Sequence, residues 1–121
     1  DPRAEPAETA FATISRAAHR ASWMALRPFT GRTHQLRAHM AGIGHPILGD
    51  PKYGDEASKE LSGPLKLQLH ARRIELEHPS GGMLVVEAPL SPEMRAGFAH
   101  FGFEEAEGNE SDPFEGVRRQ R

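Results

Sequence analysis

Four glycines and two prolines fall within the fourteen residues from Gly42 to Asp55. Glycine and proline at this density break helices and strands, so no regular element is expected to run through the segment. Ile47, Leu48 and Tyr53 lie among these breakers and need apolar cover. The sequence therefore predicts an ordered loop that folds over the helix preceding it.

A cationic stretch from Arg27 to Met40 precedes this loop, with three arginines, two histidines and a glutamine around a Thr-Gly turn. Apolar spacing predicts a helix over Thr33–Ile43 with one face on the core, formed by Leu36, Met40 and Ile43. Thr30 or Thr33 is expected to cap this helix. Because a helix N-terminus presents N–H groups and partial positive charge, the stretch predicts a phosphate or carboxylate site.

Arg37 lies about 100° around the predicted helix from Leu36, at the edge of its apolar face. An arginine there can pack its stem on apolar surface while its guanidinium reaches a carboxylate. The alternative is an ordinary surface arginine on a solvated helix, where ion pairs are weak.

Charge is segregated along the chain. Between Thr9 and Gly49 there is no acidic residue, and five arginines fall there: Arg16, Arg20, Arg27, Arg32 and Arg37. After Phe103 the tail holds six acidic residues and three arginines, which leaves 12 basic and 11 acidic residues elsewhere. The basic half predicts a positive patch that meets a phosphate backbone, unless spatial neighbours supply the balancing acids.

The remaining elements are predicted from alternation, caps and turns. Strands are expected over Thr9–Ser15, Arg20–Arg27, Leu65–Glu77 and Met83–Ala88, forming one sheet, with a bulge near Arg72-Arg73 and a turn over 79–82. Helices are expected over Glu56–Ser62 and after Ser91-Pro92-Glu93, the second with Met94, Phe98 and Phe101 on its inner face. Trp23 is expected in the core, or as a wall packed by its neighbours, rather than as a platform for a base.

Composition narrows the class of protein. The 121 residues predict one domain, with a flexible leader over residues 1–8 and a disordered acidic tail over residues 104–121. Cysteine is absent, and no window approaches 18 apolar residues, so we expect a soluble, cytoplasmic protein without a membrane partner. His34 and His39 would lie about 140° apart on a helix, so no metal site is predicted. No P-loop or dinucleotide motif occurs, and no nucleophile elbow.

Four motifs occur in order, and they are Arg27–Met40, Gly44–Asp50 followed by Tyr53-Gly54, Leu69-His70-Ala71, and His78-Pro79. Together they resemble the C-terminal half of the catalytic domain of RluA-type RNA pseudouridine synthases, from about Thr9 to Phe103. The resemblance implies an α+β fold with a mixed, largely antiparallel sheet. It also implies isomerisation of uridine to pseudouridine in structured RNA, rRNA or tRNA, without metal or cofactor. The target base would be flipped out of its stack.

The resemblance also implies roles for single residues. Arg37 would form the ion pair with the nucleophilic aspartate, since a buried carboxylate needs a fixed cation to stay ionised. Arg32, Thr33, His34 and Gln35 would contact RNA at the helix start.

This sequence departs from the family's pattern in one respect. The nucleophilic aspartate belongs to a His-Arg-Leu-Asp type of motif, which does not occur in these residues. Asp50 matches a different position and is expected to pin its loop, and Tyr53 does not match the family's active-site tyrosine. We therefore expect a fragment that lacks the N-terminal half of the catalytic domain and is inactive alone. The alternatives are a non-catalytic RNA-binding module of the same fold, or a protein-interaction domain with an incidental basic face.

Overall fold

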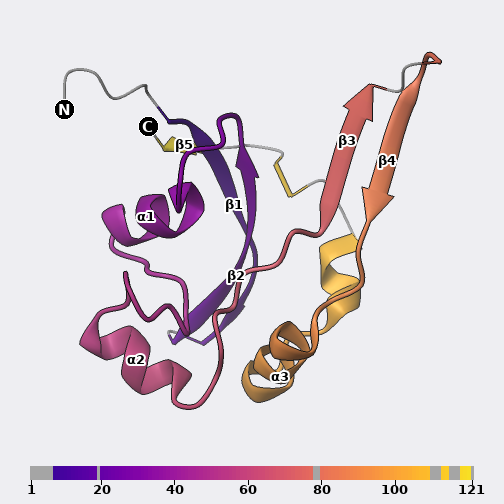
Figure 1. Cartoon of the computed structure of the whole chain (residues 1–121). Coiled ribbons are helices and arrows are strands. Elements are labelled where there is room, and N and C mark those ends of the chain that lie inside the picture. The colour runs from indigo at the N-terminus through magenta and orange to yellow at the C-terminus, as the bar shows by residue number, and fades with distance from the viewer. Residues whose placement is uncertain (1–6, 19, 78–79, 110–112, 115–117, 121) are drawn as a thin grey trace, which may run out of the picture.

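The computed structural model describes residues 7–18, 20–77, 80–109, 113–114 and 118–120, and most of the predicted leader lies outside them. Helices and antiparallel strands are both present in this part of the chain, so the predicted α+β class is confirmed. Figure 1 shows the chain order of the elements.

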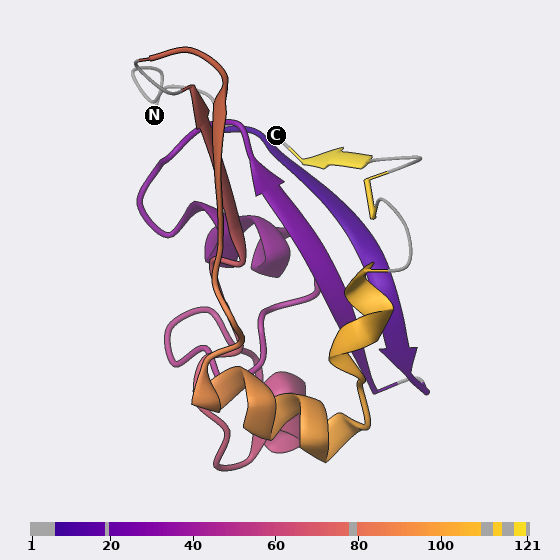
Figure 2. The same cartoon turned by 90° about the vertical axis from the view of Figure 1, so that its right-hand side faces the viewer.

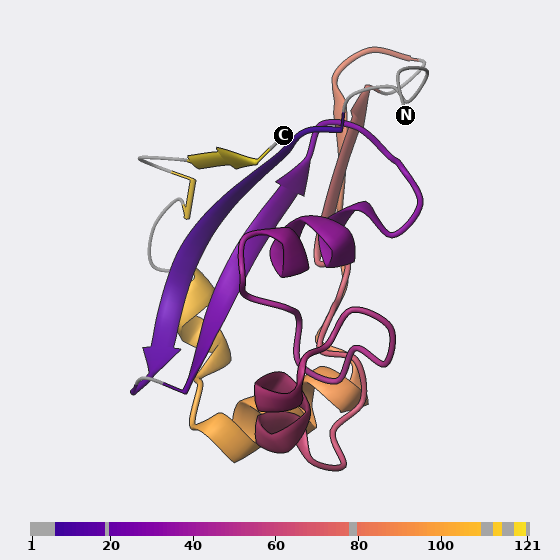
Figure 3. The same ribbon diagram turned by 90° about the vertical axis from the view of Figure 1, so that its left-hand side faces the viewer.

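The first sheet is built on the N-terminal hairpin that the alternating sequence predicts. Strand β1 (Thr9–Ala17) pairs antiparallel with β2 (Ala21–Pro28), and the ladder shifts register between Thr13 and Ser15. Helix α1 (Gln35–Gly42) lies on one face of this hairpin, and the 3₁₀-helix η1 (Glu105–Asn109) lies on the other (Figures 2 and 3). The chain from β2 into α1 therefore turns at one end of the sheet.

The second hairpin stands apart from the first. Strands β3 (Arg73–Glu77) and β4 (Met83–Glu87) pair with each other, and in the described residues they form a separate two-stranded sheet (Figure 1). The expectation of a single sheet is therefore wrong. Met83 and Val85 on β4 are 59% and 45% exposed, so this hairpin presents apolar surface to solvent.

The strand predicted from Leu65 and the bulge at Arg72-Arg73 are also corrected. Residues 65–72 form no strand, and β3 begins only at Arg73. The backbone N–H of Gln68 instead donates to the carbonyl of Leu48, 2.9 Å away, in the glycine-rich loop. The alternating leucines face a cavity, but their backbone packs on a loop rather than on a strand.

Helices α2 (Glu56–Ser62) and α3 (Pro92–Phe101) confirm the local sequence signals. Asp55 caps α2 by accepting from the N–H of Ser58, whose hydroxyl accepts in return from the N–H of Asp55. Ser91 caps α3 by accepting from the N–H of Met94, and a proline occupies the first helical position. No helix in the described residues has the length and apolar content needed to cross a membrane.

Trp23 lies in an aromatic cluster, as predicted. Its ring centroid is 4.6 Å from that of Phe98 and 6.1 Å from that of Phe103. The backbone of η1 lies against the same ring, because a Cβ added to Gly108 would approach it to 2.9 Å. This packing orders part of the segment that composition predicted to be disordered.

The C-terminal segment departs further from that prediction. Strand β5 (Arg118–Gln120) pairs antiparallel with the first residues of β1, and the Arg27 guanidinium lies 4.4 Å from the centroid of the Phe114 ring. The composition of the tail, which is acidic and poor in apolar residues, could not predict these contacts, because the partners lie about a hundred positions earlier in the sequence. The described parts of the tail are therefore ordered against the N-terminal hairpin.

Candidate functional site

Helix α1 begins two residues later than its apolar pattern predicts. His34 takes a left-handed backbone conformation with φ of 52°, which ends the preceding turn and lets the helix begin at Gln35. No side chain caps this helix, so the expectation that Thr30 or Thr33 does so is wrong. Thr30 instead donates its hydroxyl to the Gln35 side chain.

Gln35 joins the turn to the start of β1. Its Oε1 accepts from the Thr30 hydroxyl at 2.6 Å and from the Arg32 N–H at 3.0 Å. Its Nε2 donates to the Glu8 carbonyl at 3.0 Å and to the Thr9 hydroxyl at 2.9 Å. A carboxamide offers two acceptor lone pairs and two donor hydrogens, so these four bonds fill its capacity. Gln35 is also only 6% exposed, and no atom of its amide remains for RNA in this geometry.

Replacing Gln35 with methionine should therefore destabilise the protein strongly. The thioether keeps the length of the side chain but cannot satisfy the partners at Thr30, Arg32, Glu8 and Thr9. Because unsatisfied buried polar groups cost about 1–3 kcal/mol each, we expect a loss of about 2 kcal/mol or more in the free energy of unfolding. Thr33→Ala, on the exposed neighbouring turn, is the control and should stay within about 0.5 kcal/mol. Urea titration measures both, and equal midpoints for the two variants would contradict the role of Gln35.

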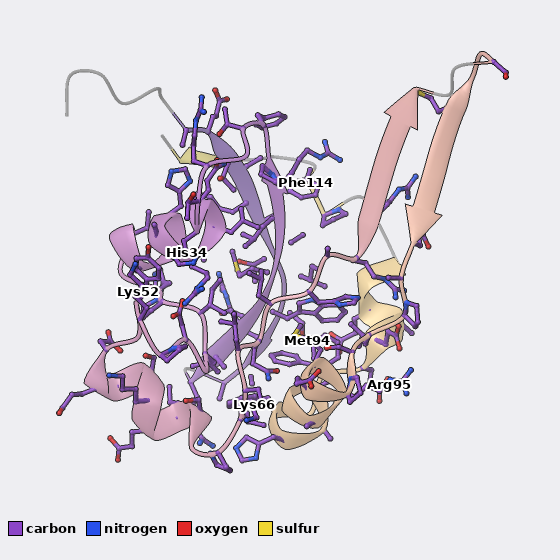
Figure 4. The ribbon with its side chains drawn as sticks, viewed as in Figure 1. His34, Lys52, Lys66, Met94, Arg95 and Phe114 are labelled. Carbon is purple, nitrogen blue, oxygen red and sulfur yellow. The ribbon has the colours of Figure 1, made fainter. Side chains whose placement is uncertain are left out.

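The residues before Gln35 form an exposed polar turn. Arg32, Thr33 and His34 are all exposed, and the His34 ring meets Tyr53 of the loop edge-on with centroids 5.8 Å apart. Lys52 lies in the same loop, and its Nζ is 5.4 Å from the Tyr53 ring centroid. Figure 4 shows His34 and Lys52 together on the side of the molecule formed by α1 and the loop. This turn and loop bring basic side chains from two separate segments to one surface.

Beneath this surface, Arg37 and Asp50 form a two-pronged ion pair. The Arg37 Nε donates to Asp50 Oδ2 at 2.9 Å, and Nη2 donates to Oδ1 at 2.7 Å. Oδ1 also accepts from the backbone N–H groups of Lys52 and Tyr53 at 2.9 and 3.1 Å, which confirms that Asp50 pins its loop. The Asp50 side chain has no exposed surface, whereas that of Arg37 is 17% exposed.

The environment of Asp50 favours its charged form. The hydrogen bonds from Arg37 hold the pKa of the Asp50 carboxyl well below its usual range, against the opposing effect of burial, and the N–H groups of Tyr53 and Lys52 lower it further. A lowered pKa in the folded state means that the stabilisation is present above the ordinary aspartate pKa. It is lost only as the pH falls through the lowered value. The pair therefore stays ionised at neutral pH.

An open cavity of about 770 Å³ adjoins the pair. Arg37, Gly49 and His70 contribute to its lining, together with Leu65, Leu67 and Leu69 from the irregular segment before β3. The lining is mixed, because Lys66 and Glu93 lie beside the apolar side chains and Arg37 contributes its guanidinium. Within the described residues, no three histidine, aspartate or glutamate side chains gather as a metal ion would require.

Comparison with known proteins identifies the class to which this arrangement belongs. A family model described as RNA pseudouridylate synthase matches residues 1–42, which include β1, β2 and α1. The dual-specificity RNA pseudouridine synthase RluA of Salmonella typhi is 42% identical over 78 residues, 64% of this chain and 35% of that protein. The chain belongs to the RluA-type family of RNA pseudouridine synthases.

Two further relatives extend the comparison. Ribosomal large subunit pseudouridine synthase C of Pasteurella multocida is 44% identical over 95 residues, 75% of this chain and 29% of that protein. The tRNA pseudouridine synthase C of Salmonella typhimurium is 42% identical over 83 residues, 64% of this chain and 32% of that protein. The chain thus spans about a third of the length of these RluA-type relatives.

In this RluA-type chain the predicted site residues lie in one region of the structure, but they differ in how far they are exposed to solvent. Arg32, Thr33 and His34 lie on the surface, while Gln35 is buried and Arg37 lies between surface and core. Sequence reasoning expected Arg37 to meet a carboxylate and assigned Asp50 only to its loop; their pairing was missed. So was Tyr53, whose ring centroid lies 5.4 Å from the Arg37 guanidinium carbon. One sequence signal could have revealed the pairing of Arg37 with Asp50. Gly49-Asp50 follows α1 after only a short loop, and such a loop can turn back onto the helix.

Proposed function

We propose that this chain supplies an RNA-facing turn and the arginine of the catalytic centre to an enzyme that converts uridine to pseudouridine in rRNA or tRNA. Membership of the RluA-type family supports the reaction class. The names of the relatives refer to both the large ribosomal subunit and tRNA, which supports both RNA classes. Such RNA is found in the cytoplasm of bacteria, where we expect the protein to act.

The observation that carries the proposal is the guanidinium of Arg37, held in a fixed orientation beside an open cavity. In the proposed reaction the target uridine leaves its stack, and an aspartate supplied by another part of the protein assists cleavage of the glycosidic bond. The uracil then turns and is rejoined through carbon. Arg37 would pair with that aspartate and keep it ionised in a site from which RNA excludes water.

The exposed turn is the proposed contact with the RNA backbone. Arg32, Thr33 and His34 present a cation, a hydroxyl and an imidazole, which are groups that bind phosphate and sugar. Gln35 lies directly behind them, and we assign it to holding the turn rather than to contacting RNA, since its four hydrogen bonds are made within the protein.

Arg32→Ala should weaken RNA binding by the complete protein and lower the slope of log K against log salt by about one unit, because one phosphate contact is lost. Arg20→Ala is the matched control. Arg20 belongs to the same basic half of the sequence and is also exposed, but it lies at the opposite end of β2, so we place it outside the RNA-facing turn. Its slope should equal that of the wild type. Fluorescence anisotropy with rRNA and tRNA fragments at several salt concentrations measures both variants. An unchanged slope for Arg32→Ala would show that this residue serves the fold instead.

The activity itself is tested with the complete gene product that contains these residues. Incubation with unmodified rRNA and tRNA transcripts, followed by chemical mapping, should reveal pseudouridine at defined positions. The 121-residue chain alone should give none, because the family's aspartate motif is not among its residues. A non-catalytic RNA-binding module is the alternative: the complete protein would then bind RNA with a steep salt dependence and form no product.

A further inference from the structure

Asp50 occupies only one edge of the Arg37 guanidinium. The group has five N–H donors in a plane, and Asp50 takes the one on Nε and one on Nη2. Within the described part of the chain, the other three N–H groups have no hydrogen-bond partner. Two of them, one on Nη1 and one on Nη2, form the end of the guanidinium, which remains available for a second carboxylate.

Asp50 is also held by contacts other than those with Arg37. Its Oδ1 accepts from two backbone N–H groups, at Lys52 and Tyr53, and its side chain is fully buried. The Tyr53 ring lies beside the guanidinium at 5.4 Å and limits its movement out of this plane. An arginine side chain free in solvent loses rotamer entropy when it is fixed, whereas these contacts hold the Arg37 side chain in place in the folded protein.

We propose that Asp50 is a positioning residue for Arg37 and that Arg37 therefore bridges two carboxylates, Asp50 on its Nε edge and the attacking aspartate on its free end. This inference rests on the proposed function. The negative charge of Asp50 partly cancels the positive charge of the guanidinium. Asp50 therefore contributes to the orientation of Arg37 and does not strengthen its electrostatic attraction for the attacking aspartate. A residue that only pinned the loop would have no reason to place both of its oxygens on Arg37.

The test is a double-mutant cycle on the complete gene product, with pseudouridine formation in an unmodified transcript as the readout. In Asp50→Asn the remaining Oδ1 still accepts from Lys52 and Tyr53, so the loop stays pinned. The amide Nδ2 then faces the Arg37 Nε–H, and two donors cannot bond. The guanidinium keeps only the bond from Nη2 to Oδ1, so it is free to rotate away from its fixed orientation. We expect kcat to fall at least tenfold with KM changed less than twofold.

The second arm of the cycle separates positioning from a loop effect. In an Arg37→Met background, Asp50→Asn should cause no further fall in kcat, because Asp50 acts through Arg37. Asp55→Asn is the matched control: the same chemical change is made at the cap of α2, and its kcat should equal that of the wild type. A multiplicative loss in the double variant, or an Asp50→Asn variant within threefold of wild type, would overturn the inference.

Two measurements keep this inference distinct from the proposed function. A wild-type protein that forms no pseudouridine defeats the proposed function and the inference built on it, before any variant is compared. If the wild type is active but the losses in kcat from Arg37→Met and Asp50→Asn multiply in the double variant, the inference fails and the proposed function stands. In the purified wild type, the NMR signal of the Arg37 Nε–H should also exchange slowly with solvent and become fast in Asp50→Asn. Fast exchange in the wild type would contradict the fixed geometry.

Discussion

Replacing Arg37 with methionine in the complete protein should reduce the rate of pseudouridine formation at least tenfold, and by far more if the arginine is the sole counter-ion of the attacking aspartate. Methionine keeps the apolar stem and removes the guanidinium, so the carboxylate loses both its charge partner and its orientation. Single-turnover mapping of pseudouridine measures the effect. A variant that keeps more than about a tenth of the wild-type rate would rule out this role for Arg37.

The ion pair with Asp50 adds a consequence for stability that the helical pattern alone did not predict. Arg37→Met leaves the fully buried Asp50 carboxylate with only two backbone donors and no counter-charge. We therefore expect a lower melting temperature as well as a lower rate.

The double variant Arg37→Met/Asp50→Asn separates these two effects. Removing the unpaired charge should raise the melting temperature above that of Arg37→Met without restoring turnover. Recovery of activity together with stability would mean that Arg37→Met is inactive only because it unfolds.

Substituting alanine for Gly49 should destabilise the protein by more than about 4 kcal/mol, a magnitude that few single substitutions reach. Gly49 has φ of +78°, and a Cβ there would overlap the carbonyl of Lys66 and lie 2.8 Å from the N of Leu67. Both obstacles are backbone atoms, which cannot rotate away. The loop would have to leave residues 65–67, and Asp50 would move with it.

Gly102 supplies a matched control for this substitution. It has the same φ of +78° at the C-terminal cap of α3, but a Cβ there would meet nothing within 4 Å. Gly102→Ala should therefore cost only the left-handed backbone strain, about 1–2 kcal/mol. Chemical denaturation of the two variants gives the difference, which isolates the steric contribution. Similar losses for both would show that the loop does not pack on residues 65–67 as described.

The elements that the sequence predicted well are those stabilised by neighbours in the chain. Helices α2 and α3 are capped by Asp55 and Ser91, whose side chains accept from N–H groups only three residues later. The β1–β2 hairpin follows from alternation on both sides of a short turn. In each case the decisive interaction spans a few residues and can be read from a short window.

The predictions that failed depend on contacts between distant segments. Leucines at alternate positions from Leu65 indicated a strand, but the backbone N–H of Gln68 bonds the loop at Leu48 instead of a neighbouring strand. The acidic tail contains η1 and β5, which pack on Trp23 and β1. Alternation and composition report what a segment can bury, and they do not report which distant partner buries it.

The same division holds for the site. The sequence by itself determined the family, the basic turn from Arg32 to His34, and the presence of an arginine at the edge of the helix. Only the tertiary structure decided that Gln35 faces inward, since its partners at Glu8 and Thr9 lie 27 and 26 residues away. It also decided that Asp50 meets Arg37, thirteen residues earlier. Motifs record which chemical groups are present, whereas orientation arises from hydrogen bonds that form only when the folded chain brings separate segments together.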